Sequence, residues 1–268
     1  MTTSDGLAPL PPLPPRADFR RRVLAGERLI GGFVNLGSIS ATEVMARAGY
    51  DWLLIDLEHG MGTDADLHAQ LLAAQSAPGA AIVRVASAER LRVGRALDFG
   101  ADGLMIPRVE SAAEVIAALT WMRWPPAGIR GVALPNRGGG YGEQTHTQLA
   151  ARNAAVTGVF QIESMVAVDA ADDIAAIEGV DVLFIGPADL SHSMGMPGRF
   201  REPTFVEQLE RVVAAARKHG KAAGILLAAD ALAWELELGF TFIGIGSDGG
   251  ILQSGAREQV AGARRTLG

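Results

Sequence analysis

The chain contains no cysteine, which excludes disulfides, thiolate nucleophiles and zinc–thiolate sites. Lysine is almost as rare, since Lys218 and Lys221 are the only two among 24 basic residues. No apolar run reaches the roughly 18 residues that a membrane-spanning helix needs, so no membrane partner is expected. The net charge is −6, with both signs mixed along the chain, which argues against a nucleic-acid partner.

The N-terminus carries a proline-rich stretch at residues 8–15, Ala-Pro-Leu-Pro-Pro-Leu-Pro-Pro. It has neither the basic start nor the long apolar segment of a secretory signal, so we expect a cytoplasmic protein. Residues 1–20 are predicted to form an extended or disordered tail. Residues 21–268, in a chain that is 49% apolar, are enough for one large domain with a sizeable core.

After residue 20, short apolar runs alternate with segments of 3.6-residue periodicity, several of which end before a glycine as helices often do. Eight such strand–helix units over about 250 residues match a (β/α)8 TIM barrel built as a single α/β domain. The predicted strands are Ile30–Leu36, Trp52–Glu58, Ala81–Val85, Gly103–Pro107, Gly158–Glu163, Asp181–Gly186, Ala222–Leu227 and Thr241–Gly246. The predicted helices are Ala41–Ala48, Leu67–Ser76, Ala88–Phe99, Ala112–Met122, Val166–Ala176, Thr204–His219 and Ala229–Leu238.

A doubly wound sheet is the alternative fold. Its dinucleotide sites need a Gly-x-Gly-x-x-Gly sequence directly after a strand, and the glycine-rich residues 138–142 follow no convincing strand. The surrounding segment 124–153 is too long for a plain connection, and long loops are often functional. Because it separates the fourth and fifth strands, we expect it to lie over the active face of the barrel. Residues 246–250 follow the last strand, and because Asp248 would repel a phosphate we interpret them as a turn and helix start.

Two carboxylates, Glu163 and Asp189, each follow a short run typical of a buried strand. A lone carboxylate in that place is costly unless it is paired or bound to a cation. Two of them without a soft ligand nearby favour a hard divalent ion held by oxygen. Acidic residues are also common at helix starts, so capping stays an open alternative at this point.

Three further polar residues lie at predicted strand ends, where TIM barrels place their chemistry. Gln161 is two residues from Glu163, so both project from one strand face, which we interpret as the barrel interior. Arg84 ends an otherwise apolar strand and suits a carboxylate or a developing oxyanion, although pairing with a loop acid is the alternative. His59 is the only histidine directly after a predicted strand, and its pKa range suits proton transfer.

Five motifs in this order resemble the HpcH/HpaI aldolases, the metal-dependent pyruvate aldolases, over roughly residues 21–268. Each motif is weak alone, but five in order with compatible spacing are highly specific. They are Asp56-Leu57-Glu58-His59-Gly60, Val83-Arg84, Pro126-Ala127-Gly128-Ile129-Arg130-Gly131, Gln161-Ile162-Glu163-Ser164 and Gly186-Pro187-Ala188-Asp189-Leu190-Ser191.

The resemblance implies a (β/α)8 barrel that binds Mg²⁺, Mn²⁺ or Co²⁺ and forms hexamers, trimers of dimers that exchange the last helix. Carried over by position, Glu163 and Asp189 would be the metal ligands, and Gln161 and the backbone around Ala188 would hold pyruvate. Arg84 would stabilise the transition state and His59 would be the base. The acid that raises the basicity of this histidine falls on Asp98, while Asp56 is the nearer candidate along the chain.

The implied activity is reversible cleavage of 4-hydroxy-2-oxoacids into pyruvate, or an analogue such as hydroxypyruvate, and an aldehyde. The chain departs from the family at Asn35 and Val85, so Asn35 and His146 are candidates for altering aldehyde preference. A Schiff-base mechanism is disfavoured because both lysines precede the seventh strand, at the opposite end of the barrel. The alternatives are a citrate-lyase-β-like enzyme acting on a CoA thioester and a non-catalytic barrel that binds an oxoacid.

Overall fold

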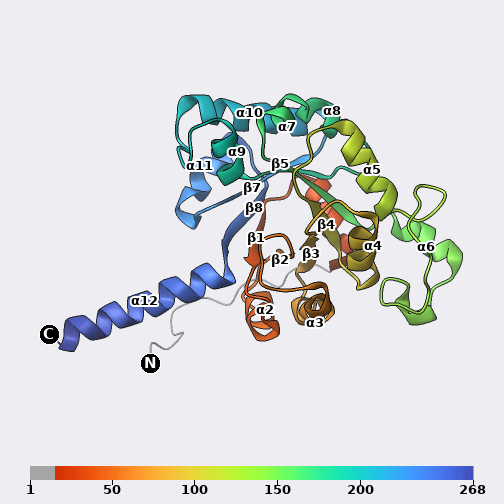
Figure 1. Ribbon diagram of the computed structural model, residues 1–268, viewed down its shortest axis with the longest axis horizontal. Coiled ribbons are helices and arrows are strands. Elements are labelled where there is room, and N and C mark those ends of the chain that lie inside the picture. The colour runs from red at the N-terminus through yellow and green to blue at the C-terminus, as the bar shows by residue number, and fades with distance from the viewer. Residues whose placement is uncertain (1–15, 268) are drawn as a thin grey trace.

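The computed structural model describes residues 16–267, so the predicted proline-rich tail lies largely outside the described residues. Eight parallel strands form a closed barrel in sequence order, with helices around it (Figure 1). The predicted (β/α)8 barrel is therefore confirmed. The strands are β1 Leu29–Val34, β2 Trp52–Asp56, β3 Ala80–Arg84, β4 Gly103–Ile106, β5 Thr157–Ile162, β6 Val182–Ile185, β7 Ala222–Leu227 and β8 Phe242–Ser247.

All eight predicted strands are present, with ends that differ by a few residues. The predicted helix over 166–176 is two short helices that meet at Ala170. The helices are η1 Arg16–Asp18, α1 Phe19–Leu24, α2 Ile39–Ala46, α3 Asp64–Ala74, α4 Arg90–Asp98, α5 Ala112–Met122, η2 Gly140–Gly142, α6 His146–Arg152, α7 Met165–Asp169, α8 Ala171–Ala175, α9 Pro187–Ser193, α10 Pro203–Lys218, η3 Ala229–Ala231, α11 Leu232–Leu238 and α12 Asp248–Leu267.

Alternate strand residues point into the barrel and fill it with a compact aromatic cluster. The rings of Trp52 and Phe242 stack with centroids 4.3 Å apart, and Phe184 meets both edge-on. Gly31 makes room for this arrangement, because a Cβ at that position would lie 2.0 Å from the Trp52 ring. Side chains therefore fill the interior of the barrel toward the amino ends of the strands, and the carboxyl ends of the strands are left for a site.

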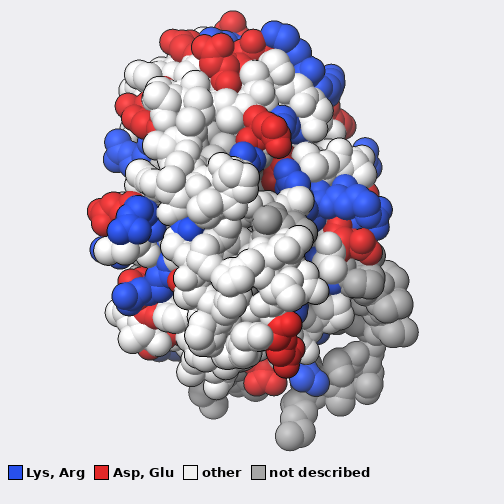
Figure 2. Space-filling view, turned by 90° about the vertical axis from the view of Figure 1, so that its right-hand side faces the viewer, with Lys and Arg blue, Asp and Glu red and all other residues white. Residues whose placement is uncertain are grey.

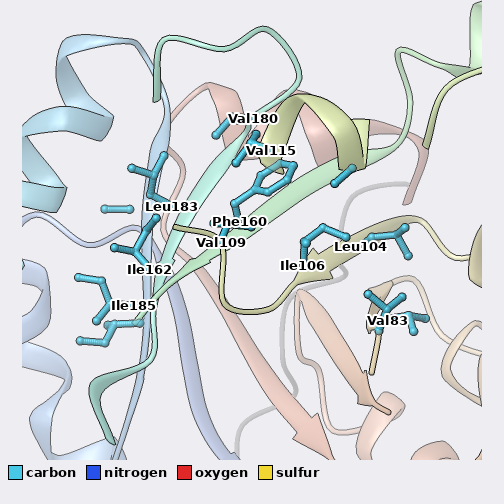
Figure 3. Packing of buried hydrophobic residues seen from close by; sticks show 14 of the residues in the cluster. Val83, Leu104, Ile106, Val109, Val115, Phe160, Ile162, Val180, Leu183 and Ile185 are labelled. Carbon is cyan, nitrogen blue, oxygen red and sulfur yellow. The ribbon is translucent and has the colours of Figure 1, made fainter. Parts of the chain in front are cut away.

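The opposite faces of the strands pack against the surrounding helices in a second apolar layer. Figure 3 shows Ile106, Phe160 and Ile162 beside Val109 and Val115, which belong to the chain after β4 and to α5. All five side chains are almost completely buried. This layer fixes β4, β5 and β6 relative to their helices, and therefore the direction of the polar residues at their ends.

The amino ends of the strands are closed by η1 and α1, and three acids there each pair with an arginine of this helical segment. Each carboxylate also accepts a hydrogen bond from a backbone N–H of the preceding strand. The pairs are Arg22–Asp51 at 2.8 Å, Arg16–Asp102 at 3.4 Å and Arg20–Asp181 at 2.8 Å, and the backbone donors are Ile30, Ala81 and Gly158. The predicted boundary between tail and barrel at residue 20 therefore falls inside α1.

The long segment after α5 lies at the amino end of the barrel, so the prediction that it covers the active face is wrong. Its Gly138 N–H donates to the backbone oxygen of Asp98 at the end of α4, and Arg137 contacts Gln75 at the end of α3. The reason is topological, since a segment between a helix and the next strand lies at the opposite end from the strand–helix loops. Figure 2 shows the side of the molecule that carries this segment, with acidic and basic residues around a largely uncharged centre.

The last helix, α12, projects away from the barrel (Figure 1). Its first residue, Asp248, is the only buried one that it has among the described residues. The interpretation of residues 246–250 as a turn and helix start is right for the helix, since α12 begins at Asp248, but wrong for the turn, because β8 continues to Ser247. None of the described helices is both long and apolar enough to cross a membrane.

Candidate active site

An arginine–carboxylate pair forms the floor of the barrel mouth. Asp56 ends β2 and Arg84 ends β3, and the two residues are register partners. The guanidinium binds the carboxylate with two hydrogen bonds, Nε to Oδ1 at 2.9 Å and Nη2 to Oδ2 at 2.7 Å. Burial alone would raise the pKa of Asp56, but the hydrogen bonds and charge of Arg84 outweigh it and lower that pKa below its usual value. Arg84 is thus held rigidly, with an ionised partner.

The chain after β2 turns around the same carboxylate. The backbone N–H groups of Glu58 and His59 both donate to Asp56 Oδ1, at 3.1 and 3.2 Å. This turn directs the His59 ring to the mouth, where 64% of the side chain is exposed. Its Nε2 lies 3.8 Å from Glu58 Oε2, which is also 3.3 Å from Arg84 Nη1. Asp56 therefore contacts the backbone of His59, and Glu58 is the acid beside its ring.

Glu163 follows β5 and is buried, with only 7% of its surface exposed. Gln161 Nε2 donates to one of its oxygens at 2.7 Å, and the backbone N–H of Arg108 donates to the other at 3.0 Å. Burial, with the negative charges of Asp189 and Glu58, raises the pKa of Glu163 to about 7. Gly186 allows this packing, since a Cβ there would lie 2.5 Å from Glu163 Oε2.

Asp189 lies in the first turn of α9 and is exposed at the mouth, one residue after Ala188. Glu163 and Asp189 line one cleft together, and their mutual repulsion contributes to the raised pKa of Glu163. A divalent cation would relieve that repulsion, and each carboxylate oxygen of Glu163 keeps a lone pair beyond its one hydrogen bond. The donor set fits a hard cation. Among residues 16–267, no group of three or more His, Asp or Glu side chains is placed to hold a metal ion, so Glu163 and Asp189 are the two candidate ligands that the chain offers here.

The mouth of the barrel is a cavity of about 570 Å³, wide enough for a small organic acid. Its polar lining comes from the ends of six strands, and its apolar wall includes Phe33, Phe184 and Leu226. The polar lining residues are Asn35, His59, Arg84, Gln161, Asp189 and Ser247.

The structure brings together most of the residues that the sequence singled out. His59, Arg84, Gln161, Ala188 and Asp189 line the cavity, and Asp56 and Glu163 bind two of these side chains.

Asp98 and His146 lie elsewhere in the chain. Asp98 ends α4 and binds Arg130, with Nη2 and Oδ1 2.7 Å apart. His146 begins α6 in the long segment at the amino end. Neither Asp98 nor Asp56 contacts the His59 ring within the chain. The sequence argument missed Glu58 as a partner of Arg84 and His59, although its place directly before His59 was the available signal.

Comparison with known proteins agrees with this architecture. The family model described as HpcH/HpaI aldolase/citrate lyase matches residues 29–254. A 5-keto-4-deoxy-D-glucarate aldolase from Klebsiella pneumoniae subsp. pneumoniae is 37% identical over 90% of this chain and 94% of its own. A crystal structure of a family member from Burkholderia cenocepacia J2315 is 37% identical, with a TM-score of 0.88 over 92% of this chain and 99% of that one. The citrate synthase SbnG is 27% identical, with a TM-score of 0.82 over 92% and 97%.

The chain belongs to the HpcH/HpaI aldolase/citrate lyase family. It is an enzyme of the aldolase type, a carbon–carbon lyase.

Proposed function

We propose that the protein catalyses reversible, metal-dependent aldol cleavage of 4-hydroxy-2-oxoacids into pyruvate, or an analogue such as hydroxypyruvate, and an aldehyde. The observation that carries the proposal is the shared mouth of the barrel, where Arg84 faces the same cavity as Gln161 and Asp189. The relatives support the substrate class. Numbered from its other end, a 5-keto-4-deoxyglucarate is a 2-oxo-3-deoxy-4-hydroxy acid, which is the pattern that retro-aldol cleavage needs.

Glu163 and Asp189 would hold the divalent ion, Mg²⁺, Mn²⁺ or Co²⁺. When bound, such an ion polarises the ketone and carboxylate oxygens of the substrate as a Lewis acid. Gln161 fixes the orientation of Glu163 through their 2.7 Å hydrogen bond. The backbone N–H groups at the start of α9, near Ala188, face outward without intrahelical acceptors and suit the carboxylate of the oxoacid.

Arg84 supports the step in which charge develops. Cleavage breaks the bond between C3 and C4, and the electron pair moves toward the ketone oxygen. A fixed guanidinium at that oxygen contributes about 3–4 kcal/mol of barrier lowering, the usual effect of one such donor. Because Asp56 already fixes the guanidinium on one edge, little reorganisation is needed during the reaction.

His59 would accept the proton of the C4 hydroxyl, so that this oxygen becomes the carbonyl of the aldehyde. Its exposed ring lies at the edge of the cavity, next to Glu58. A carboxylate at this distance helps to orient the ring. In the condensation direction, the same histidine returns the proton to the new alkoxide.

Assembly is part of the proposal. Asp98 is bound to Arg130 and distant in the fold from His59 of its own chain, so a catalytic role for Asp98 requires a neighbouring subunit. Within the described chain, α12 has one buried residue. Exchange of this helix between subunits would cover its exposed side chains. We propose a hexamer, a trimer of dimers, as the form in which Asp98 acts.

A panel of aldehydes offered with pyruvate or hydroxypyruvate, each with Mg²⁺, Mn²⁺ or Co²⁺, tests the proposal directly. We expect 4-hydroxy-2-oxoacid products that disappear after exhaustive chelation and return with the ion. Full activity after chelation would refute the metal requirement. Turnover of a CoA thioester in place of these substrates would favour the lyase alternative, and binding of pyruvate without any turnover would favour a non-catalytic barrel.

His59→Ala tests which proton the histidine moves. We expect cleavage near pH 7 to fall by about 10²-fold or more, with folding and metal affinity retained. Near-normal cleavage in this variant would assign the base elsewhere and leave His59 a positioning role.

A further inference from the structure

One carboxylate at the base of α12 holds the backbone at the end of β1. Asp248 is 5% exposed, and its Oδ1 accepts a hydrogen bond from the N–H of Asn35 at 2.8 Å. Its Oδ2 accepts from the N–H of Leu36 at 3.2 Å, and Gly249 N–H also donates to Oδ1. Asp248 forms no ion pair among the described residues. The hydrogen bonds from these backbone N–H groups therefore replace the hydration that the carboxylate loses on burial.

The same contacts direct the side chain of Asn35 toward the floor of the cavity. Its Nδ2 donates to Asp56 Oδ2 at 2.8 Å. An ionised carboxylate only accepts hydrogen bonds, so the amide must present its nitrogen there. The consequence is that Asn35 Oδ1 is buried without a hydrogen-bond partner among residues 16–267. Buried acceptors of this kind are costly and rare, and they persist where another part of the group has a fixed task.

That task is the orientation of Asp56. Its Oδ1 accepts from Arg84 Nε and from two backbone N–H groups, and its Oδ2 accepts from Arg84 Nη2 and Asn35 Nδ2. Apart from Arg84 itself, Asn35 is the one side chain among the described residues that donates to this carboxylate. Removing that donor leaves Oδ2 with the guanidinium alone, so the carboxylate and the fork of Arg84 gain freedom to rotate together.

We propose that Asn35 and Asp248 are positioning residues that hold the Asp56–Arg84 pair in its working geometry and connect it to the base of α12. The connection runs from Asp248 to the backbone of Asn35, from its amide to Asp56, and from there to Arg84. It rests on the proposed function only in the role given to Arg84, because the contacts themselves are independent of the reaction.

Asn35→Leu removes the donor at similar volume, and Asp248→Asn places an amide nitrogen against at least one of the three backbone N–H groups that donate to this carboxylate. We expect each to lower kcat/KM by about 10- to 100-fold, mainly through kcat, as small misplacements of a catalytic group do. The same substitutions in an Arg84→Lys background should have little further effect, since the group they position is already lost. Ser254→Ala, on the exposed part of α12, is the matched control and should change nothing.

The Nε–H resonance of Arg84, assigned by its loss in Arg84→Lys, gives a readout that does not depend on turnover. In the intact protein this proton is bonded to Asp56 and should exchange slowly with solvent. We expect faster exchange in Asn35→Leu and in Asp248→Asn, and no change in Ser254→Ala. An unchanged resonance in both variants, or an effect on kcat/KM that adds fully to that of Arg84→Lys, would overturn the proposal. If the intact protein proves inactive with oxoacids while the resonance responds as expected, the proposed function fails and the positioning role stands.

Discussion

The two ends of the barrel contain the same kinds of residue and use them differently. At the amino end, Asp51, Asp102 and Asp181 each pair with an arginine of η1 or α1 and with a backbone N–H of the preceding strand. At the carboxyl end, neither Glu163 nor Asp189 has a cationic partner within 4 Å among the described residues.

A buried carboxylate that is paired within the chain contributes to the fold, because removing its partner exposes the full desolvation cost. A buried carboxylate without such a partner destabilises the fold slightly and is available for an ion or a substrate. The difference between the two ends therefore separates residues whose loss should affect stability from residues whose loss should affect turnover.

Among substitutions at the carboxyl end of the barrel, Glu163→Gln should lower activity most. We expect turnover to fall by about 10³-fold or more and metal affinity to fall with it, because one of two anionic ligands is lost. The free energy of unfolding of the metal-free protein should stay the same or rise, since an unpaired buried charge is removed. Steady-state kinetics, calorimetric metal titration and urea unfolding measure the three quantities, with the exposed Glu178→Gln as control. Undiminished metal affinity would exclude Glu163 as a ligand.

Arg84→Lys should show a similar bias toward activity. A lysine ammonium cannot reproduce the two-pronged contact with Asp56 and also address a substrate oxygen. We expect the rate of deuterium exchange at the methyl group of pyruvate to fall about 10²- to 10³-fold. The free energy of unfolding should fall by about 1–2 kcal/mol. Near-normal exchange would make Arg84 a structural residue, like the arginines of the amino end.

Arg20→Ala should show the reverse. It leaves Asp181 buried without its guanidinium partner, whose Nε lies 2.8 Å from the carboxylate. We expect the free energy of unfolding to fall by about 3 kcal/mol and kcat per folded molecule to remain unchanged. The neighbouring Arg21→Ala is the control, because its pair with Asp18 is exposed and should contribute little. A loss of turnover at full folding in Arg20→Ala would show that the two ends are coupled.

The sequence predicts the barrel well, because eight apolar runs with intervening helical periods allow few other folds. It also predicts which polar residues reach the mouth, since Arg84 and Gln161 sit on the inward parity of strands whose other inward residues are apolar. These are local properties of strands, and position along a strand is enough to read them.

Contacts between distant segments are what the sequence does not predict. Nothing local indicates that Asn35 binds Asp56, or that Asp248 reaches back to the first strand across more than 200 residues of chain. The prediction that the long segment after α5 covers the active face is wrong because it rests on the place of this segment between two strands. Its place after a helix is what decides the end of the barrel at which it lies. The contact of Glu58 with Arg84 belongs to the same class, because nothing local to Glu58 indicates that the guanidinium at the end of the next strand lies 3.3 Å from its carboxylate.

Glu235 refines the comparison, because it is buried and unpaired but does not line the active cavity. It lies on α11 with 1% exposure, and neither carboxylate oxygen has a hydrogen-bond partner among the described residues. Burial raises its pKa from the usual value near 4.5 to about 7, with a small opposing effect of Arg201. Folded protein therefore keeps a proton on Glu235 between about pH 4.5 and 7 that the unfolded chain has lost. Stability from this residue must fall as the pH rises through that window and level off above it.

Glu235→Gln should remove that dependence. Relative to the parent protein, the free energy of unfolding of the variant should rise by about 1–3 kcal/mol from pH 5 to pH 8. Urea unfolding at both pH values measures this difference, and kcat should be unchanged. Glu237→Gln, at an exposed position of the same helix, controls for the loss of one charge. If Glu235→Gln instead loses activity without losing stability, an unpaired buried acid indicates function even outside the mouth of the barrel. The difference between the two ends would then depend only on whether each acid has a cationic partner. If only stability and its pH dependence change, then lack of a partner is insufficient by itself, and an acid must also face the cavity at a strand end to serve the reaction.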